Sequence, residues 1–449
     1  RFKCDWSSDV CSSDLAAGAA YFGGGLTFAG ALNVTDTTDA TSTTTGSIKT
    51  AGGVGIAKSL WVGLDANIYG ITVGRGAGAV SNNATVGSGS LAANTTGSGN
   101  NAFGSISLAA NTTGTSNSAF GGATLYSNTT GSNNTAVGVS ALQSNTTASY
   151  NTAVGYQAGY ANTTGTITAI GYAALAANTT ATENTAVGRQ ALQANTTGGG
   201  NTAVGFASAI ANTTGAGLVA VGTGALVSNT TGNYNTALGN ASLYSNTTAS
   251  NNTAVGYQSG YSNTTGTQNV LVGFQAGYAN TTGNITGVGF RSLYSHTTGF
   301  QNTALGETAG YSVTTGSNIT AIGYQAGYSI ATNPQLTAVG AYAALYQTDV
   351  NDAFGYQAMR GASGTSTGYY NVAVGRQSMY SLTSGLNNVA VGLQALYSNT
   401  SGSNNTAIGY GALYSFTTSS NTVAVGYAAL SALTTGTGNT AVGAEALAS

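Results

Sequence analysis

A single 17-residue unit repeats along most of this chain. Each copy has an apolar residue followed by glycine, then Leu or Tyr, then an Asn-Thr-Thr turn, as in NNTAVGVSALQSNTTAS over Asn133–Ser149. The glycine recurs 22 times between Gly87 and Gly443, almost always 17 residues apart. One such unit cannot bury its own apolar face and must stack on its neighbours. The chain is therefore expected to form an elongated stack of coils.

Charge is too sparse for several functions. Charged residues are 4% of the chain, against about 25% in ordinary soluble domains. After residue 80 there is no lysine, and the four arginines are Arg189, Arg291, Arg360 and Arg376. Nucleic-acid binding needs a basic stripe, so it is not expected. The abundant Gly and Ser would suit a disordered chain, but the regular apolar positions argue against disorder.

The N-terminal region differs from the repeats. Asp5–Leu15, DWSSDVCSSDL, resembles the translation of a common short-read sequencing adapter, so residues 1–15 are interpreted as an artefact of an assembled fragment. Both cysteines, Cys4 and Cys11, lie in or beside it, so no disulfide is inferred. Residues 16–80 are expected to form a short β module. Their apolar stretch is broken by glycines and is not expected to span a membrane.

The residues just before the recurring glycine are predicted to form a strand. We number each copy from this glycine, so that position −1 precedes it. Position −1 is always large and apolar, and position −3 is mostly Thr or Val, so the two share one face of a period-2 strand. Position −2 is Ala in 19 of 22 copies. A side chain that small suggests close approach by another layer or another chain.

Positions +4 and +5 suggest a second buried site. Position +4 is Leu or Met in fifteen copies and Gly in five, and each such Gly is followed by Tyr, as in Gly159-Tyr160. We interpret this as volume compensation in a close-packed core lined by both positions. The Asn-Thr-Thr-Gly segment is predicted to be a turn in which Asn tolerates left-handed geometry and Gly adopts positive φ.

These observations predict an all-β fold, a parallel β-solenoid of about 22 coils of 17 residues over residues 81–449. Each coil is expected to have two short faces and to advance about 4.8 Å. The alternative is a strand plus one helical turn per coil, because the repeat consensus YQALYS has helical propensity.

The repeat also resembles known families. NTAVG is similar to the head repeats of trimeric autotransporter adhesins, which form a left-handed parallel β-roll. The longer pattern NTAVGYQALYSNTTG, and GGVGIAKSLWVG over residues 52–63, resemble phage tail-fibre proteins. This resemblance implies a homotrimeric fibre segment of a virion, acting as a shaft or binding host surface glycans or proteins. This sequence departs from the autotransporter repeats mainly in its longer coil and its added Asn-Thr-Thr turn.

Two other functions remain open. A bacterial trimeric adhesin head would place the chain on the cell surface. An ice-binding solenoid would need threonines on a flat strand face, whereas the Thr-Thr pair here is expected in the turn. Stacked tyrosines could bind sugar rings, or could simply stabilise neighbouring coils.

The sequence offers few residues that could support catalysis, and no enzymatic activity, cofactor or metal is expected. The single histidine, His296, takes the Asn slot of a turn and is expected in solvent. Asp349 and Asp352 could be a glycosidase pair, but a solvated loop is the simpler interpretation.

The register break is the candidate recognition site. Over residues 330–372 the glycine steps become 15 and 20, after the only proline, Pro334. An extra loop on a regular solenoid often displays a binding feature. Arg360, Tyr369 and Tyr370 are therefore predicted receptor contacts, with a neutral insertion as the alternative.

Overall fold

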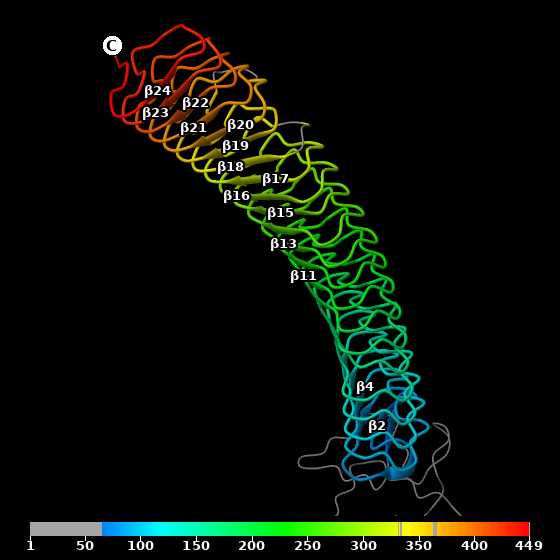
Figure 1. Ribbon diagram of the computed structural model, residues 1–449. Helices are drawn as coiled ribbons and strands as arrows, with labels where there is room; N and C mark the ends of the chain where they lie inside the picture. Colours follow the sequence, from blue (N-terminus) through cyan, green and yellow to red (C-terminus); the bar gives the residue numbers. More distant parts are fainter. Residues whose placement is uncertain (1–64, 331, 333–334, 362–365, 449) are drawn as a thin grey trace, which may run out of the picture. The chain divides into compact units, whose positions relative to one another are not determined.

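A parallel stack of strands forms the backbone of the molecule. The computed structural model describes residues 65–330, 332, 335–361 and 366–448, which belong to one compact unit, Gly63–Ser449. Strands β3 to β24 pair in parallel, each with the next along the chain, as Figure 1 shows. The fold prediction of a parallel β-solenoid is therefore confirmed, with about 21 turns spaced by about 17 residues. Residues 1–15 and most of residues 16–80 lie outside the described part.

The strands are short. Their bounds are β3 Ala84–Val86, β4 Asn101–Phe103, β5 Ser118–Phe120, β6 Thr135–Val137, β7 Thr152–Val154, β8 Ile167–Ile170, β9 Asn184–Val187, β10 Thr202–Val204, β11 Val219–Val221, β12 Thr236–Leu238, β13 Thr253–Val255, β14 Val270–Val272, β15 Ile285–Val288, β16 Asn302–Leu305, β17 Ile319–Ile322, β18 Leu336–Val339, β19 Asn351–Phe354, β20 Asn371–Val374, β21 Val389–Val391, β22 Thr406–Ile408, β23 Val423–Val425 and β24 Thr440–Val442.

A hairpin precedes the first coil. Strands β1 (Ala66–Ile68) and β2 (Ile71–Gly74) pair antiparallel, and β2 also pairs antiparallel with β3. A single 3-10 turn, η1 (Ala77–Ala79), follows β2. The hairpin thus adds its two strands to the end of the parallel sheet.

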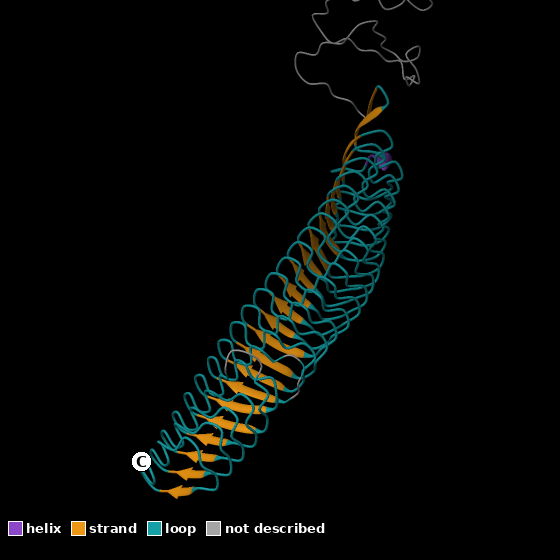
Figure 2. Cartoon of the chain, turned by 90° about the horizontal axis from the view of Figure 1, so that it is seen from above, coloured by secondary structure: helices purple, strands orange, loops and turns teal. Residues whose placement is uncertain are grey.

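Each coil has one strand, and the rest of it is turns (Figure 2). The expected second strand face is not formed in the described residues, and neither is the alternative helical turn. The reason is the backbone at positions +2 and +4, which is left-handed: φ is 58° at Ser140 and 50° at Leu142. A right-handed helix cannot contain such residues. Backbone hydrogen bonds still join the turns from coil to coil, as from Leu142 N to Ala158 O at 2.9 Å.

The strand turns its alanine inward. Equivalent residues pair across coils, Ala136 with Ala153 and Val137 with Val154. Both alanines are fully buried, whereas the two valines are more than a third exposed. The layer that approaches the alanine is therefore the opposite wall of its own coil, where Leu142 is fully buried. Positions −3 and −1 form what we call the outer strand face.

The predicted volume compensation between positions +4 and +5 is wrong, because the side chains that fill the space beside Gly159 are not that of the residue at +5. A side-chain carbon added at Gly159 would lie 2.7 Å from Ile167 Cδ1 and 3.0 Å from Leu142 Cδ2. The space is therefore filled by Ile167 from the next coil and Leu142 from the previous one, while Tyr160 is partly exposed. Ile167 occupies the slot that is Asn151 one coil earlier, so at Gly159 the volume comes from neighbouring coils rather than from the next residue in the sequence.

The Asn-Thr-Thr asparagine is not a left-handed turn former. Asn145 is fully buried and its backbone φ is negative. Its Nδ2 donates to Asn128 Oδ1 in the previous coil at 2.8 Å and to the carbonyl of Ala148 at 3.0 Å. Successive coils repeat this contact from Asn94 to Asn280, which makes a ladder of amides inside that part of the solenoid. Later coils often place an apolar residue in the same slot, as at Val313, Ile330 and Phe416. The glycine that ends this turn also has negative φ; at Gly131 an added side-chain carbon would meet the Ala148 carbonyl of the next coil at 2.3 Å.

A second asparagine ladder lies beside the first, at position −4. Asn134 is fully buried, and its Nδ2 donates to Asn117 Oδ1 at 3.1 Å and to Ala148 O at 2.9 Å. The two ladders thus converge on the same carbonyl of each coil. Asn134 and Asn145 thus bond both within their coil and to the coil before it, which satisfies these buried amides without charge.

The recurring glycine is needed for two reasons. Its φ is 126° at Gly138, a region that side chains rarely adopt. A side-chain carbon there would also lie 2.5 Å from the carbonyl oxygen of Gly155 in the next coil. The glycine therefore permits both the sharp exit from the strand and the close stacking of coils.

The irregular section does not interrupt the sheet. Strand β19 pairs in register with β18 before it and β20 after it, including Asp352 opposite Thr337 and Val372. The additional residues are accommodated between Gly361 and Tyr369, in a segment of which 362–365 are not described. The stack continues through the change of coil length because only the loop varies.

Ile167→Ala is expected to lower the free energy of unfolding by about 3 kcal/mol, because it opens a cavity between Gly159 and Leu142. Tyr160→Ala should cost less than about 1 kcal/mol, because that ring is partly exposed. Denaturant titration followed by circular dichroism measures both. A larger loss of stability for Tyr160→Ala than for Ile167→Ala would instead support volume compensation between sequence neighbours.

Candidate binding surface

Two columns of aromatic residues run along the solenoid. The first aromatic column is position +1, and it includes Tyr257, Phe274 and Phe290, each more than 40% exposed. The second aromatic column is position +5, and its longest run is Tyr244, Tyr261, Tyr278, Tyr294, Tyr311 and Tyr328. The repeat aligns chemically equal residues because each coil returns to the same register.

Rings within a column stack on one another. In the second aromatic column, Tyr294 and Tyr311 have centroids 5.2 Å apart and planes 5° apart. In the first, Phe274 and Phe290 are 5.3 Å apart with planes at 13°. Each inner ring therefore has both faces covered by its neighbours and presents only its edge to solvent. Sugar rings bind to aromatic faces, so these runs fit coil stabilisation better than sugar stacking.

A column of glutamines lies between the aromatic columns, at position +2. Gln275 Nε2 donates to Gln258 Oε1 at 2.9 Å, and Arg291 Nε donates to Gln275 Oε1 at 3.0 Å. The Arg291 guanidinium lies 5.2 Å from the Phe290 centroid and 5.3 Å from that of Tyr294. One side chain thus contacts both aromatic columns, which shows that positions +1, +2 and +5 form one continuous surface.

All four arginines of the repeats belong to this surface. Arg189 lies between Tyr172 and Phe206 of the two neighbouring coils, at 5.8 and 5.5 Å from their centroids. Such cation–π contacts stabilise neighbouring coils. Arg189, Arg360 and Arg376 therefore take the places of aromatic rings in the columns, whereas Arg291 takes the place of a glutamine.

Arg360, a predicted receptor contact, follows the same rule. It occupies position +5 between Tyr346 and Tyr380, at 5.7 and 5.4 Å from their centroids, and its Nη1 donates to Tyr380 Oη at 2.7 Å. Nearby, desolvation raises the pKa of Tyr397, Tyr380 and Tyr414 raise it further, and the charge of Arg360 opposes the rise. Arg360 thus lies in the second aromatic column and not on a separate loop.

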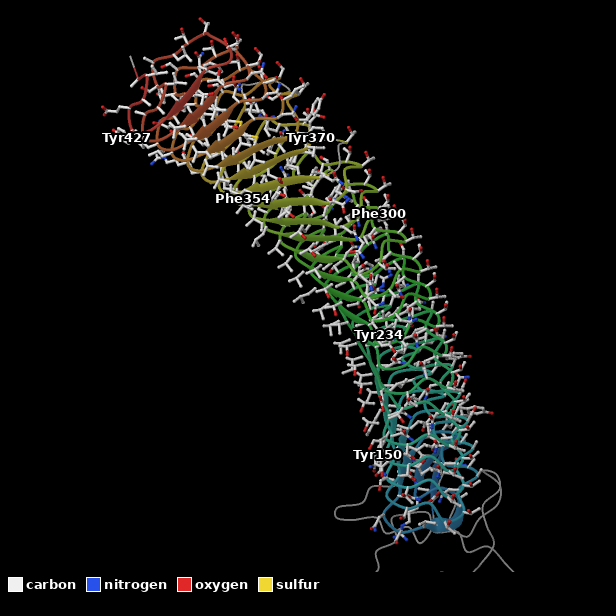
Figure 3. All side chains as sticks on the ribbon, in the orientation of Figure 1. Tyr150, Tyr234, Phe300, Phe354, Tyr370 and Tyr427 are labelled. Carbon is white, nitrogen blue, oxygen red and sulfur yellow. The ribbon has the colours of Figure 1, made fainter. Side chains whose placement is uncertain are left out.

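The other two predicted contacts form a pair of their own. Tyr369 and Tyr370 meet edge to face with centroids 5.0 Å apart, and Tyr370 is 62% exposed. Within the described residues neither ring contacts Arg360. Tyr370 shares its slot, position −5, with the exposed Tyr150 and Tyr234, which are labelled with it in Figure 3. The structure therefore brings the two tyrosines together but assigns Arg360 to a different surface.

The candidate acidic pair lies on the solenoid wall. Asp352 projects from β19 on the outer strand face, and Asp349 lies in the turn before it, where Thr348 Oγ1 donates to its Oδ2 at 3.4 Å. Across the described ranges no cluster of three or more His, Cys, Asp or Glu side chains could hold a metal ion. The same part of the chain has no helix long and apolar enough to cross a bilayer.

His296 is buried, and its predicted place in solvent is wrong. It takes the place of an asparagine in the first ladder, the one that contains Asn145. Its Nδ1 contacts Asn280 Oδ1 at 3.0 Å, and Asn302 Nδ2 contacts its Nε2 at 3.0 Å. Because Asn302 donates to Nε2, the neutral ring carries its proton on Nδ1. Burial lowers the pKa of His296 to about 4, with a smaller opposing effect from the backbone of Gly299.

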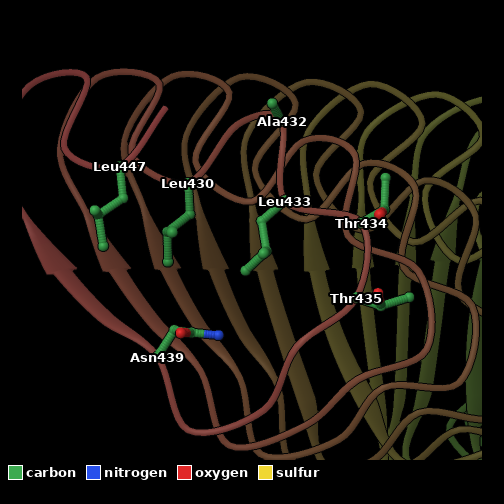
Figure 4. A pocket seen from close by; sticks show the side chains of 7 residues that line it. All are labelled: Leu430, Ala432, Leu433, Thr434, Thr435, Asn439 and Leu447. Atoms are coloured by element: carbon green, nitrogen blue, oxygen red, sulfur yellow. The ribbon is translucent and has the colours of Figure 1, made fainter. Parts of the chain in front are cut away.

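A hollow of about 390 Å³ lies at the final coil (Figure 4). It is lined by Leu430, Leu433 and Leu447, with Thr434, Thr435, Ala432 and Asn439. Leu447, in the last coil that the structure describes, is 63% exposed, whereas equivalents in inner coils such as Leu413 are fully buried. The hollow is thus lined largely by leucines at positions that form the core in earlier coils.

The fold and this surface define a β-solenoid repeat protein with stacked aromatic columns. Searches against protein-family models and against curated proteins found no match.

His296 predicts a pH dependence of local stability. Its pKa is about 4 when folded and about 6.5 when unfolded, so its contribution is complete above pH 6.5 and lost as the pH falls towards 4. The loss is expected to reach about 3 kcal/mol near pH 4. Hydrogen exchange of the surrounding coil amides, compared between pH 7.5 and 4, measures it.

His296→Asn restores the ladder residue and provides the control. On going from pH 7.5 to pH 4, this variant should lose less protection from hydrogen exchange than the original chain. Equal losses in both proteins would show that His296 does not control the acid response.

Proposed function

We propose that this chain is a structural and adhesive segment of a phage tail fibre, whose copies associate as a homotrimer. The outer strand face is the observation that carries this proposal. Position −1 presents an unbroken row of Val, Ile, Leu and Phe along β3 to β24, and many are 36–48% exposed. Contiguous exposed apolar surface of this kind marks interaction sites.

A second copy of the chain is the partner that best matches this face. Covering one exposed valine per coil would contribute about 1 kcal/mol, and the contribution recurs in every coil. From Thr135 to Val339 no charged residue interrupts positions −3 and −1 of the outer strand face. A partner with the same regular period can follow this row along its length, which an ordinary globular surface cannot do.

The likeness of NTAVGYQALYSNTTG to tail-fibre repeats supports the virion as the location, with recognition of host surface glycans or proteins. A trimeric adhesin head on a bacterial surface uses the same architecture and is the alternative. Both assignments require an elongated, self-associating stack of coils.

Ice binding becomes a second candidate through a threonine column on the outer strand face. The Thr-Thr pair lies in the turn as expected, but position −3 adds a separate row that includes Thr152, Thr168, Thr185 and Thr202. Strands in register repeat this row every 4.7–4.9 Å or so. Because Thr and Val are stiff at χ1, this row presents a rigid and regular array of side chains, which favours ice as a candidate ligand.

Lysines on the outer strand face should prevent association. Replacing Val204, Leu238 and Leu305 together by Lys introduces charges that would be buried at the interface. The molar mass measured by light scattering should therefore fall from that of a trimer to that of a monomer. A chain that is already monomeric at high concentration would contradict the homotrimer.

The matched control carries three lysines outside this face, at Thr223, Asn240 and Glu307 of the first aromatic column. It should keep the molar mass of the original chain. Inhibition of ice recrystallisation by a monomeric original chain, lost in the strand-face variant and kept in the control, would select the ice-binding function instead.

A further inference from the structure

Arg360 and Arg376 bring two cations into adjacent coils. Arg360 occupies position +5 of the coil that begins at Gly355, and Arg376 occupies position +1 of the next coil. The other two arginines of the repeats, Arg189 and Arg291, have no arginine or lysine in a neighbouring coil. In a chain with so few charges, this is the strongest concentration of positive charge after residue 80.

Both guanidinium groups are held in place by aromatic rings. Arg360 lies between Tyr346 and Tyr380 and donates to Tyr380 Oη. Arg376 lies 5.5 Å from the centroid of Tyr356 in the previous coil. Rings that already restrict these long side chains reduce the entropy lost when a ligand binds. Each guanidinium has five N–H donors, so most remain free for an anion.

A column of glutamines runs through the same coils as the two arginines. Gln377 Nε2 donates to Gln357 Oε1 at 2.9 Å, and Gln394 Nε2 donates to Gln377 Oε1 at 3.1 Å. This column occupies position +2, which adjoins both position +1 and position +5. We call Arg360, Arg376 and these three glutamines the arginine strip.

Nearby carboxylates leave the strip positive. Within the described residues neither Arg360 nor Arg376 forms an ion pair with an acid. Asp352 belongs to the outer strand face of the same coil, and Asp349 accepts a hydrogen bond from Thr348 in the turn before it. Glu307 lies three coils earlier. An incoming anion would therefore not have to displace an internal partner.

We propose that the arginine strip binds an anionic glycopolymer lying along the solenoid axis. This inference rests on the proposed recognition function and names its ligand class. The ligand's repeating carboxylate or phosphodiester groups would accept hydrogen bonds from the two guanidiniums, and its hydroxyls would meet the glutamine amides. An extended polymer suits the strip because successive coils offer equivalent groups about 5 Å apart.

Recognition here does not use sugar stacking on aromatic faces. Tyr380 stacks on Tyr397 with centroids 5.1 Å apart, and Arg360 covers its other side. The rings therefore position the cations, while charge and hydrogen bonding select the ligand. Tyr369 and Tyr370 lie outside the strip and are not part of this site.

Binding of polygalacturonate, poly(glycerol phosphate) and neutral dextran to the full chain tests the proposal by calorimetry. At least one anionic polymer should bind and dextran should not. Arg360→Gln and Arg376→Gln should each weaken that binding about tenfold, since each removes a charge-assisted contact. The polymer that binds distinguishes carboxylate from phosphodiester recognition.

Arg189→Gln is the matched control, because Arg189 is also held between two rings but has no second cation beside it. It should leave affinity unchanged, and circular dichroism should show that all three variants keep the fold. Equal weakening by Arg189→Gln, binding of dextran as tight as that of the anionic polymers, or no binding of either anionic polymer would each overturn the proposal. Light scattering on the same samples reports the homotrimer separately, so the two hypotheses can fail independently.

Discussion

The two buried asparagine ladders are the interaction on which the rest of the structure depends. A coil of 17 residues must reverse direction several times, which leaves buried backbone carbonyls that need donors, and successive coils must keep one register. Asn145 and Asn134 meet these needs together, because both donate to the carbonyl of Ala148 and to asparagines in the neighbouring coil. Burial strengthens such bonds and makes an unpaired amide costly. The ladders therefore help to hold in register the coils that contain them, most continuously from Asn94 to Asn280.

The exceptions to the ladders follow the same logic. Ile167 replaces a ladder asparagine next to Gly159, where the leucine of other coils is missing, and it fills the space that results. His296 replaces another and keeps its hydrogen bonds through the neutral ring. Each position therefore accepts either a paired polar group or a matching apolar volume, and a charged group satisfies neither condition.

The ladders also determine what the surface can do. Where coils are in register, as in the run from Tyr244 to Tyr328, the aromatic rings stack with their edges toward solvent, and the inner faces are not available to sugars. Arginines intercalated in the same columns, such as Arg360 and Arg376, keep free N–H donors. Specific recognition on a regular solenoid then depends on where such cations coincide, whereas self-association can use the outer strand face along its length.

The sequence by itself determined the period, the parallel stack and the strand beside each glycine. It did so because a 17-residue spacing returns every residue type to the same place, and because Gly138 and its equivalents must allow positive φ and close contact. Which face of the strand lies inside was decided only by the closed coil. Period-2 alternation shows that Thr135 and Val137 share a face, but not that Ala136 is the residue small enough for the lumen. The same closure placed the asparagines inside and the tyrosines outside. Hydrogen bonds and volumes shared between coils decided both placements, and neither is visible within a single repeat.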